Sequence, residues 1–428
     1  MKHYFLGMAA NYSGGKWLRH LFAVGRKRDY DELAEFLGKK YDGEAVLCKN
    51  GRSALALALK TYFRPGDEVL VNGFTCYAVY EAVKAAKLKP VFVDINKQDL
   101  NFDIKTLRNA RSGRFEVIRD NGSEIASEPR NDGRERSGPR SDWTSVQGII
   151  IQNTLGNPVD IKAIERFAKE NDLLIIEDLA HSAGIRYPDG REAGTVGVAT
   201  VLSFGKDKSV DTISGGAVVF RGELLSNFGA RPAGPLPRAA GATPRAAALR
   251  TPSVLTKASP SKLPRLRDHL RARFYPMFGA LCRTLSYVHL GGVLMRLLVK
   301  IHLVEKSADN KLDLERRMSK FEAKLALEQI KKLKNKPLRK FYLVDDREKV
   351  LKELRKAGYF FDGFWYEKPV SPERYYKKVH FPEEECPNAV FVSKRIINFP
   401  NIYSREELAT ARKIIEKYLI KEGADGKK

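Results

Sequence analysis

Helix-like and strand-like segments alternate along most of this chain, and that alternation constrains the fold more than any other feature. An Ala/Leu-rich helical pattern at 53–63 is followed by a strand pattern at 67–72, and the pair then repeats. Short apolar runs at 173–178, 199–204 and 215–220 are typical of buried strands. The sequence therefore predicts an α/β fold with a largely parallel sheet.

Two stretches interrupt the alternation. Residues 111–143 are rich in Arg, Ser, Gly, Asn and Asp, which predicts an exposed, disordered insertion. Residues 229–267 are dominated by Ala, Pro and Arg and are not expected to pack a core. Because 428 residues exceed one usual domain, we predict a large domain over 1–222, a linker with an apolar helical insertion over 223–313, and a smaller C-terminal α/β domain over 314–428.

Residues 274–304 form an apolar stretch that is interrupted by Pro276, Arg283, Arg296 and Lys300. These interruptions argue against a helix that spans a membrane. Two interpretations stay open. The stretch forms helices that pack on the protein or on a partner subunit, or it forms a basic amphipathic anchor on a membrane surface.

The charge and cysteine content limit the classes of protein. A formal net charge of +24 is compatible with anionic partners, but no nucleic-acid-binding module accompanies it, so no specific nucleic-acid role is expected. The four cysteines are widely scattered, which suits a reducing compartment, and the N-terminus has no signal-peptide pattern. We expect a cytoplasmic protein, and no metal site.

Polar side chains follow two of the buried strands, at the sheet edge where ligands of such folds bind. Asp178 ends one strand, and Ser203 ends the next, ahead of a turn that carries Lys206 and Lys208 and leads to a pair of glycines. A carboxylate, a hydroxyl and a lysine are what a protein offers to the ring nitrogen, the phosphate and the aldehyde of pyridoxal 5′-phosphate (PLP). Taken alone, Asp178 is equally consistent with a helix cap or a metal ligand.

Two further segments suit the same cofactor. Gly51, Arg52 and Ser53 directly precede an Ala/Leu helix, whose first N–H groups form an anion site, although a plain Ser N-cap explains the pattern equally well. An aromatic side chain for the cofactor ring is offered by Phe74 or Tyr77, for which core packing is the commoner role.

In this order the segments resemble the DegT/DnrJ/EryC1/StrS family of PLP-dependent sugar aminotransferases. The matching motifs are SALALAL from Ser53, PGDEVLVNGFTC from Pro65, IEDLAH from Ile176 and SFGKDKSVDTISGG from Ser203. The resemblance implies the aspartate-aminotransferase-like (type I) fold and a homodimer with shared active sites.

The resemblance also implies roles for individual residues. Lys208, five residues after Ser203, is implied as the lysine that binds PLP covalently, and Asp178 as the partner of the ring nitrogen. Gly51, Arg52, Ser53 and Ser203 are implied around the phosphate.

Three positions depart from the family pattern. His181 replaces the usual glutamine beside the ring and adds a group that titrates near neutral pH. Cys76 replaces the usual stacking aromatic, which leaves neighbouring Tyr77 as the substitute. Glu315 replaces an asparagine that reaches the partner subunit's cofactor, where Arg316 or Arg317 is available instead.

The predicted function is transfer of an amino group from an amino acid, glutamate by resemblance, to a keto-sugar carried on a nucleotide. Amino-sugar or surface-glycan synthesis would use such a reaction. Relatives that carry histidine at the lysine position dehydrate sugars, so Lys208 favours transamination over that alternative. A non-catalytic binding relative with the same fold is the alternative from another class.

Overall fold

The computed structural model describes residues 3–16, 18, 26–111, 146–221, 266–288, 292–309, 322–363 and 365–420. The central element is a seven-stranded sheet in the order β2-β9-β8-β7-β6-β3-β5. Neighbours from β8 to β5 run parallel, whereas β9 is antiparallel to both β8 and β2. The strands are β2 (Glu44–Cys48), β3 (Glu68–Asn72), β5 (Lys89–Val93), β6 (Val146–Ile151), β7 (Leu174–Asp178), β8 (Ala199–Ser203) and β9 (Gly216–Phe220).

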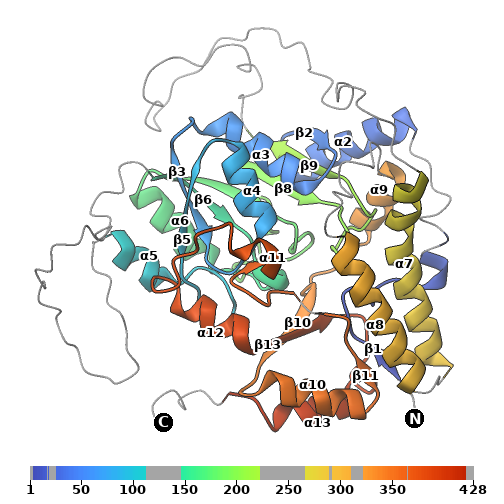
Figure 1. Ribbon diagram of the computed structural model, residues 1–428. Coiled ribbons are helices and arrows are strands. Elements are labelled where there is room, and N and C mark those ends of the chain that lie inside the picture. The colour runs from blue at the N-terminus through green and yellow to red at the C-terminus, as the bar shows by residue number, and fades with distance from the viewer. Residues whose placement is uncertain are drawn as a thin grey trace, which may run out of the picture.

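Helices cover both faces of this sheet (Figure 1). One face packs against α2 (Lys27–Tyr41), α6 (Ile161–Glu170) and α9 (Ala323–Lys331). The other face packs against α3 (Gly51–Tyr62), α4 (Tyr77–Ala85) and α12 (Pro387–Arg395). The sheet is thus buried on both sides, which explains why its strands are apolar runs without polar alternation.

The C-terminal residues form a smaller unit around an antiparallel pair, β10 (Arg339–Leu343) and β13 (Ile396–Pro400). Its core includes Val350 and Leu354 of α10 and Ile415 of α13. The other elements here are α10 (Arg347–Lys356), β11 (Tyr359–Phe360), β12 (Val370–Ser371), α11 (Glu373–Tyr376) and α13 (Ala409–Glu416).

Two short strand pairs join this unit to distant parts of the chain. β1 (Tyr4–Phe5) pairs with β11, and β4 (Thr75–Cys76) pairs with β12. The start of the chain therefore lies on the C-terminal unit, while the predicted division at 222 and 314 stays a prediction.

The apolar stretch forms two helices, α7 (Leu266–Tyr287) and α8 (Gly292–Asp309), which lie beside each other at one side of the molecule (Figure 1). Phe278 and Cys282 of α7 and Met295 and Val299 of α8 bury against the N-terminal segment. A Cβ at Gly279 would lie 2.0 Å from the carbonyl oxygen of Ala9, so only glycine allows this close approach. Among the described helices, none is long and apolar enough to cross a membrane.

Several predictions fall outside the described residues. These are the body of the insertion predicted at 111–143, the Pro/Ala/Arg-rich stretch up to residue 265, and the positions of Glu315, Arg316 and Arg317. The remaining helix, α5 (Ile104–Arg111), leads into the first of these stretches.

Candidate active site

The site is assembled where β7 and β8 end and where α3 begins. Asp178 is the last residue of β7, Ser203 is the last residue of β8, and Lys208 lies in the loop after β8, where its charge acts on Asp178. The carboxyl ends of neighbouring parallel strands meet at one sheet edge, which explains why residues so far apart in sequence converge.

Asp178 is a buried carboxylate with spare hydrogen-bonding capacity. It is 5% exposed, and its Oδ1 accepts the N–H of Ala180 at 3.0 Å. Within the described part of the chain no donor reaches Oδ2. Burial raises the pKa of Asp178, while the positive charge of Lys208 acts to lower it. A cationic N–H placed at this oxygen would therefore be held strongly.

The structure fixes the tautomer of His181. Its Nδ1 accepts the backbone N–H of Leu155 at 3.2 Å, so Nδ1 carries no proton. Burial, followed by the charges of Lys208 and Arg339, holds the pKa of His181 well below its usual value. The ring is consequently neutral with its proton on Nε2, which lies 3.4 Å from the Tyr366 hydroxyl oxygen. The charge near neutral pH that the sequence suggested at this position is thus removed by its surroundings.

Lys208 points its ammonium group at an aromatic face. Its Nζ lies 4.6 Å from the ring centroid of Trp365, and that ring in turn packs on His181 at 4.9 Å between centroids. Lys208 rather than Lys206 is the lysine whose charge acts on both Asp178 and His181. The assignment of the reactive lysine to Lys208 stays a prediction, but the structure brings it to the predicted acid.

The start of α3 lies directly against the end of β8. Asn50, not Ser53, is the N-cap, and its Oδ1 accepts the Ser53 N–H at 2.8 Å. A Cβ at Gly51 would lie 2.5 Å from the Cβ and 2.8 Å from the Oγ of Ser203, so glycine is required for this approach. The first N–H groups of the helix therefore lie beside the Ser203 hydroxyl, and both kinds of donor are suited to an anion.

Two residues that were predicted to contact the cofactor, Arg52 and Tyr77, contact other side chains of the protein. The guanidinium of Arg52 pairs with Glu81 of α4, at 2.5 Å. Tyr77 stacks on Tyr375 of α11, with ring centroids 4.3 Å apart. Within the described residues, no recorded contact of Tyr77 reaches Asp178, His181 or Lys208, so its predicted place on the cofactor ring stays a prediction.

Residues from the C-terminal unit complete the site, and the sequence did not single them out. Trp365 and Tyr366 cover Lys208 and His181, and the Tyr366 ring also lies 4.8 Å from that of Phe74. Trp365 exchanges two backbone hydrogen bonds with the Asn398 side chain, and the same side chain accepts from Arg339 Nε at 2.8 Å. The only signal in the sequence was a cluster of aromatic residues at 364–366.

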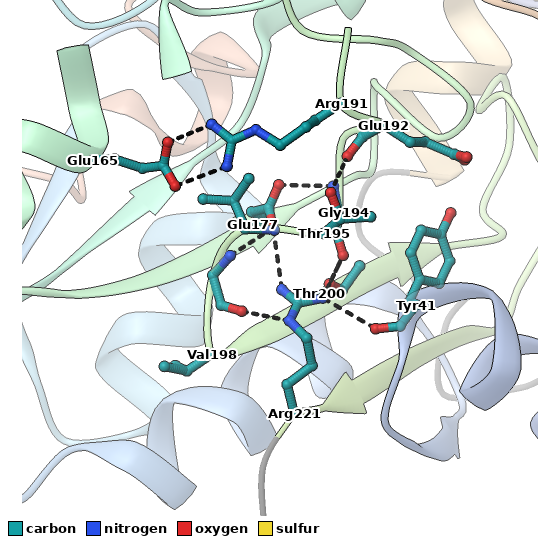
Figure 2. A network of polar contacts seen from close by, with 12 residues as sticks. Tyr41, Glu165, Glu177, Arg191, Glu192, Gly194, Thr195, Val198, Thr200 and Arg221 are labelled. Atoms are coloured by element: carbon teal, nitrogen blue, oxygen red, sulfur yellow. Dashed lines mark hydrogen bonds and ion pairs between the residues drawn. The ribbon is translucent and has the colours of Figure 1, made fainter. Parts of the chain in front are cut away.

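Glu177, the neighbour of Asp178, serves a different purpose. Its two carboxylate oxygens accept hydrogen bonds from five groups, and those from Gly194 and Arg221 can be followed in Figure 2. The donors are the hydroxyl of Tyr187 (2.6 Å), the N–H groups of Gly194 (2.7 Å), Val196 (2.7 Å) and Gly197 (2.8 Å), and the guanidinium of Arg221 (3.1 Å). Glu177 is fully buried and saturated, so it holds the 194–197 loop against the sheet rather than a ligand.

Comparison with known sequences identifies one family. Residues 26–228 match the model of the DegT/DnrJ/EryC1/StrS aminotransferase family, which confirms the predicted family over this segment. The chain is 27% identical over 215 residues to a GDP-4-keto-6-deoxy-D-mannose 3-dehydratase of Yersinia pseudotuberculosis, covering 48% of this chain and 46% of that protein. It is 29% identical over 191 residues to a UDP-2-acetamido-2-deoxy-3-oxo-D-glucuronate aminotransferase of Pseudomonas aeruginosa, covering 44% of each. The chain thus spans less than half the length of these relatives.

Comparison with solved structures covers nearly the whole chain. A DegT/DnrJ/EryC1/StrS aminotransferase from Brucella abortus superposes with a TM-score of 0.52 at 18% identity, over 95% of this chain and 94% of that one. The predicted fold class is therefore confirmed as the type I fold of sugar aminotransferases and dehydratases.

Proposed function

We propose, from the membership of residues 26–228 in the DegT/DnrJ/EryC1/StrS aminotransferase family, that this protein is a PLP-dependent aminotransferase acting on a keto-sugar. The observation that carries the proposal is that Lys208, whose Nζ lies over the Trp365 ring beside His181, acts by its charge on a buried Asp178 whose Oδ2 meets no donor among the described residues. Glutamate as amino donor, a nucleotide-linked acceptor and a homodimer are parts of the same proposal.

The side chains present fit the cofactor. Asp178 would hold the ring nitrogen in its protonated form, because a buried carboxylate with a raised pKa favours a cationic partner. The first turn of α3 and the adjoining Ser203 hydroxyl, which the absence of a Cβ at Gly51 brings together, would donate to the phosphate. The Nε2–H of His181 is a neutral donor for an oxygen on the ring. When bound, PLP supplies an electron-withdrawing ring that stabilises negative charge on the substrate carbon.

Lys208, Trp365 and Tyr366 would have separate roles in the reaction. Lys208 would bind the cofactor and then carry a proton at its Nζ, since it is the lysine that lies near Asp178 and His181. Trp365 holds this amine over its ring face, within reach of the site. Tyr366 and Trp365 also pack on His181, which is only 3% exposed, and so exclude water from it.

Sugar dehydration is the second candidate, because a relative of the chain carries that name. Lys208 favours transamination, since some relatives with histidine at this position dehydrate sugars. A supplied amino donor distinguishes the two, because only transamination leaves nitrogen on the sugar product.

The first experiment is the visible absorption spectrum of the protein mixed with PLP, before and after borohydride reduction, followed by peptide mass mapping. We expect a yellow band that reduction fixes on Lys208. Lys208→Ala removes the band, whereas the matched variant Lys206→Ala keeps it. A protein that stays colourless with added PLP contradicts the proposal and favours a non-catalytic relative.

We also propose that α7 and α8 rest on an anionic membrane surface. Of the eight large apolar side chains exposed in the described part of the chain, six lie in 281–297, including Val293 (74%) and Leu297 (51%). Exposed Arg296 and Lys300 accompany them, and residues 276–300 contain no acidic side chain. A second copy would bring like charges together, whereas anionic lipid offsets them.

Vesicle co-sedimentation tests this surface. We expect binding to phosphatidylglycerol vesicles, weaker binding to phosphatidylcholine, and loss of binding in Val293→Ser/Leu297→Ser. Leu419→Ser, which alters an exposed leucine elsewhere, is the control. If the double variant instead breaks a dimer in light scattering, the surface belongs to a second copy.

A further inference from the structure

The loop that carries Lys208 contains two residues in a strained backbone conformation. Asp207, directly before Lys208, has φ of 61°, and Ile213 has φ of 70°. Residues other than glycine rarely adopt these left-handed angles, which are especially unfavourable for β-branched isoleucine. Specific side-chain contacts must therefore maintain this shape.

A single carboxylate binds both strained residues. Asp211 is fully buried, its Oδ2 accepts the Asp207 N–H at 2.9 Å, and its Oδ1 accepts the Ile213 N–H at 3.0 Å. Lys208 lies between these anchor points, and its own N–H meets the carbonyl oxygen of Gly205 at 3.3 Å. The position of the lysine backbone thus depends directly on Asp211.

Two distant segments hold Asp211 in turn. The Tyr12 hydroxyl donates to Oδ2 at 2.6 Å, and the Lys16 ammonium lies 3.9 Å from the same oxygen. Gln329 of α9 pairs with the backbone of Asp211 twice, accepting its N–H at 2.8 Å and donating to its carbonyl at 2.9 Å. The loop is consequently clamped from the N-terminal segment and from α9.

Among the described residues, every group that binds the carboxylate is a donor, which suits an aspartate because both of its oxygens accept. Asparagine has the same shape but offers one acceptor oxygen, and its NH₂ group would face an N–H or the hydroxyl. A buried donor without an acceptor is costly, so the substitution should loosen the loop rather than merely weaken one contact.

We propose that Asp211, held by Tyr12 and Gln329, is the positioning residue that fixes Lys208 for reaction. The role in reaction rests on the proposed function, whereas the clamp itself does not. Asp211 does not touch the reacting atoms, and it acts through the backbone at Asp207 and Ile213.

Hydrogen–deuterium exchange of the 204–215 peptide, without added cofactor, tests the clamp. We expect Asp211→Asn to speed exchange about 10- to 100-fold, as the loss of hydrogen bonds to a charged group implies. Tyr12→Phe should give a smaller increase. Tyr403→Phe is the matched control, because it removes another buried hydroxyl bond, to the Phe5 carbonyl, away from the loop.

The reactivity of the lysine supplies the second measurement. Competitive amine acetylation should change the Lys208-to-Lys206 labelling ratio several-fold in Asp211→Asn but not in Tyr403→Phe. Unchanged loop exchange and labelling in a folded Asp211→Asn protein would overturn the proposal. If both change as expected while wild type fails to bind PLP at Lys208, the clamp stands and the proposed function fails.

Discussion

Two neighbouring carboxylates at the end of β7 differ in how the protein treats them. Glu177 receives five hydrogen bonds, including one from the guanidinium of Arg221, and is fully buried. Asp178 is almost as buried but receives one, from the Ala180 N–H, within the described residues. Side chains of successive strand residues point to opposite faces, so the two occupy separate environments. A buried carboxylate whose oxygens all accept hydrogen bonds stabilises the fold, whereas a buried carboxylate with an oxygen left over can bind a ligand.

The largest expected effect is the loss of catalytic rate when Asp178 is substituted. Asp178→Asn should lower the rate of amino transfer by about 10²- to 10⁴-fold, the usual contribution of a positioned acid or base, because the ring nitrogen loses its anionic partner. Its Tm should change little, since an amide oxygen still accepts the Ala180 N–H. Steady-state kinetics and calorimetry of this variant, beside Glu177→Gln, measure both. Equal losses of activity in the two variants would contradict the assignment of different roles to Asp178 and Glu177.

Substitution of Glu177, whose side chain lies on the opposite face of β7 from that of Asp178, should reduce the stability of the protein. Glu177→Ala leaves the largely buried Arg221 unpaired and removes the acceptor of the 194–197 loop, so we expect the free energy of unfolding to fall by about 3–5 kcal/mol. Urea unfolding measures this change. Activity per folded molecule should stay near that of wild type, and a catalytic defect without a stability defect would contradict the assignment.

His181, on the Asp178 side, predicts a pH dependence of stability. Its folded pKa lies well below the unfolded value of about 6.5, so the unfolded state binds more protons under acidic conditions. Stability should therefore fall as the pH drops below about 6.5, by up to about 1.4 kcal/mol per pH unit. Unfolding at several pH values, compared with His181→Gln, isolates this contribution. An identical acid slope in the variant would show that His181 does not titrate in this way.

The smallest effect belongs to the rim of the Glu177 network. Arg191 binds Glu165 there, but their side chains are 40% and 34% exposed (Figure 2). Glu165→Ala should change the free energy of unfolding by less than about 1 kcal/mol, since solvent screens such pairs. Urea denaturation measures the loss of unfolding free energy in Glu165→Ala and in Glu177→Ala. Losses of similar size would show that solvent exposure does not explain the difference between the two carboxylates.

Motifs that follow strands were predictable because strand ends and sheet edges are local consequences of sequence. Asp178 and Ser203 were identified in this way, whereas Lys208 was chosen over Lys206 by the resemblance to the family, and its charge acts on Asp178. Spacing alone did not predict that Tyr77 stacks on Tyr375, which comes from a distant part of the chain. Contacts with a second unit decide such cases.

The sequence by itself determined the α/β class, the match of residues 26–228 to the family and the polar residues at the strand ends, since periodicity and motif order are properties of the chain. Only the tertiary structure decided the protonation of His181, the covering of the site by Trp365 and Tyr366, and the clamp on Asp211. Each depends on residues far apart in sequence, 185 positions for Tyr366 with His181 and 199 for Tyr12 with Asp211. Burial and charge around a side chain set its pKa and its partners, and these exist only once distant segments have packed together.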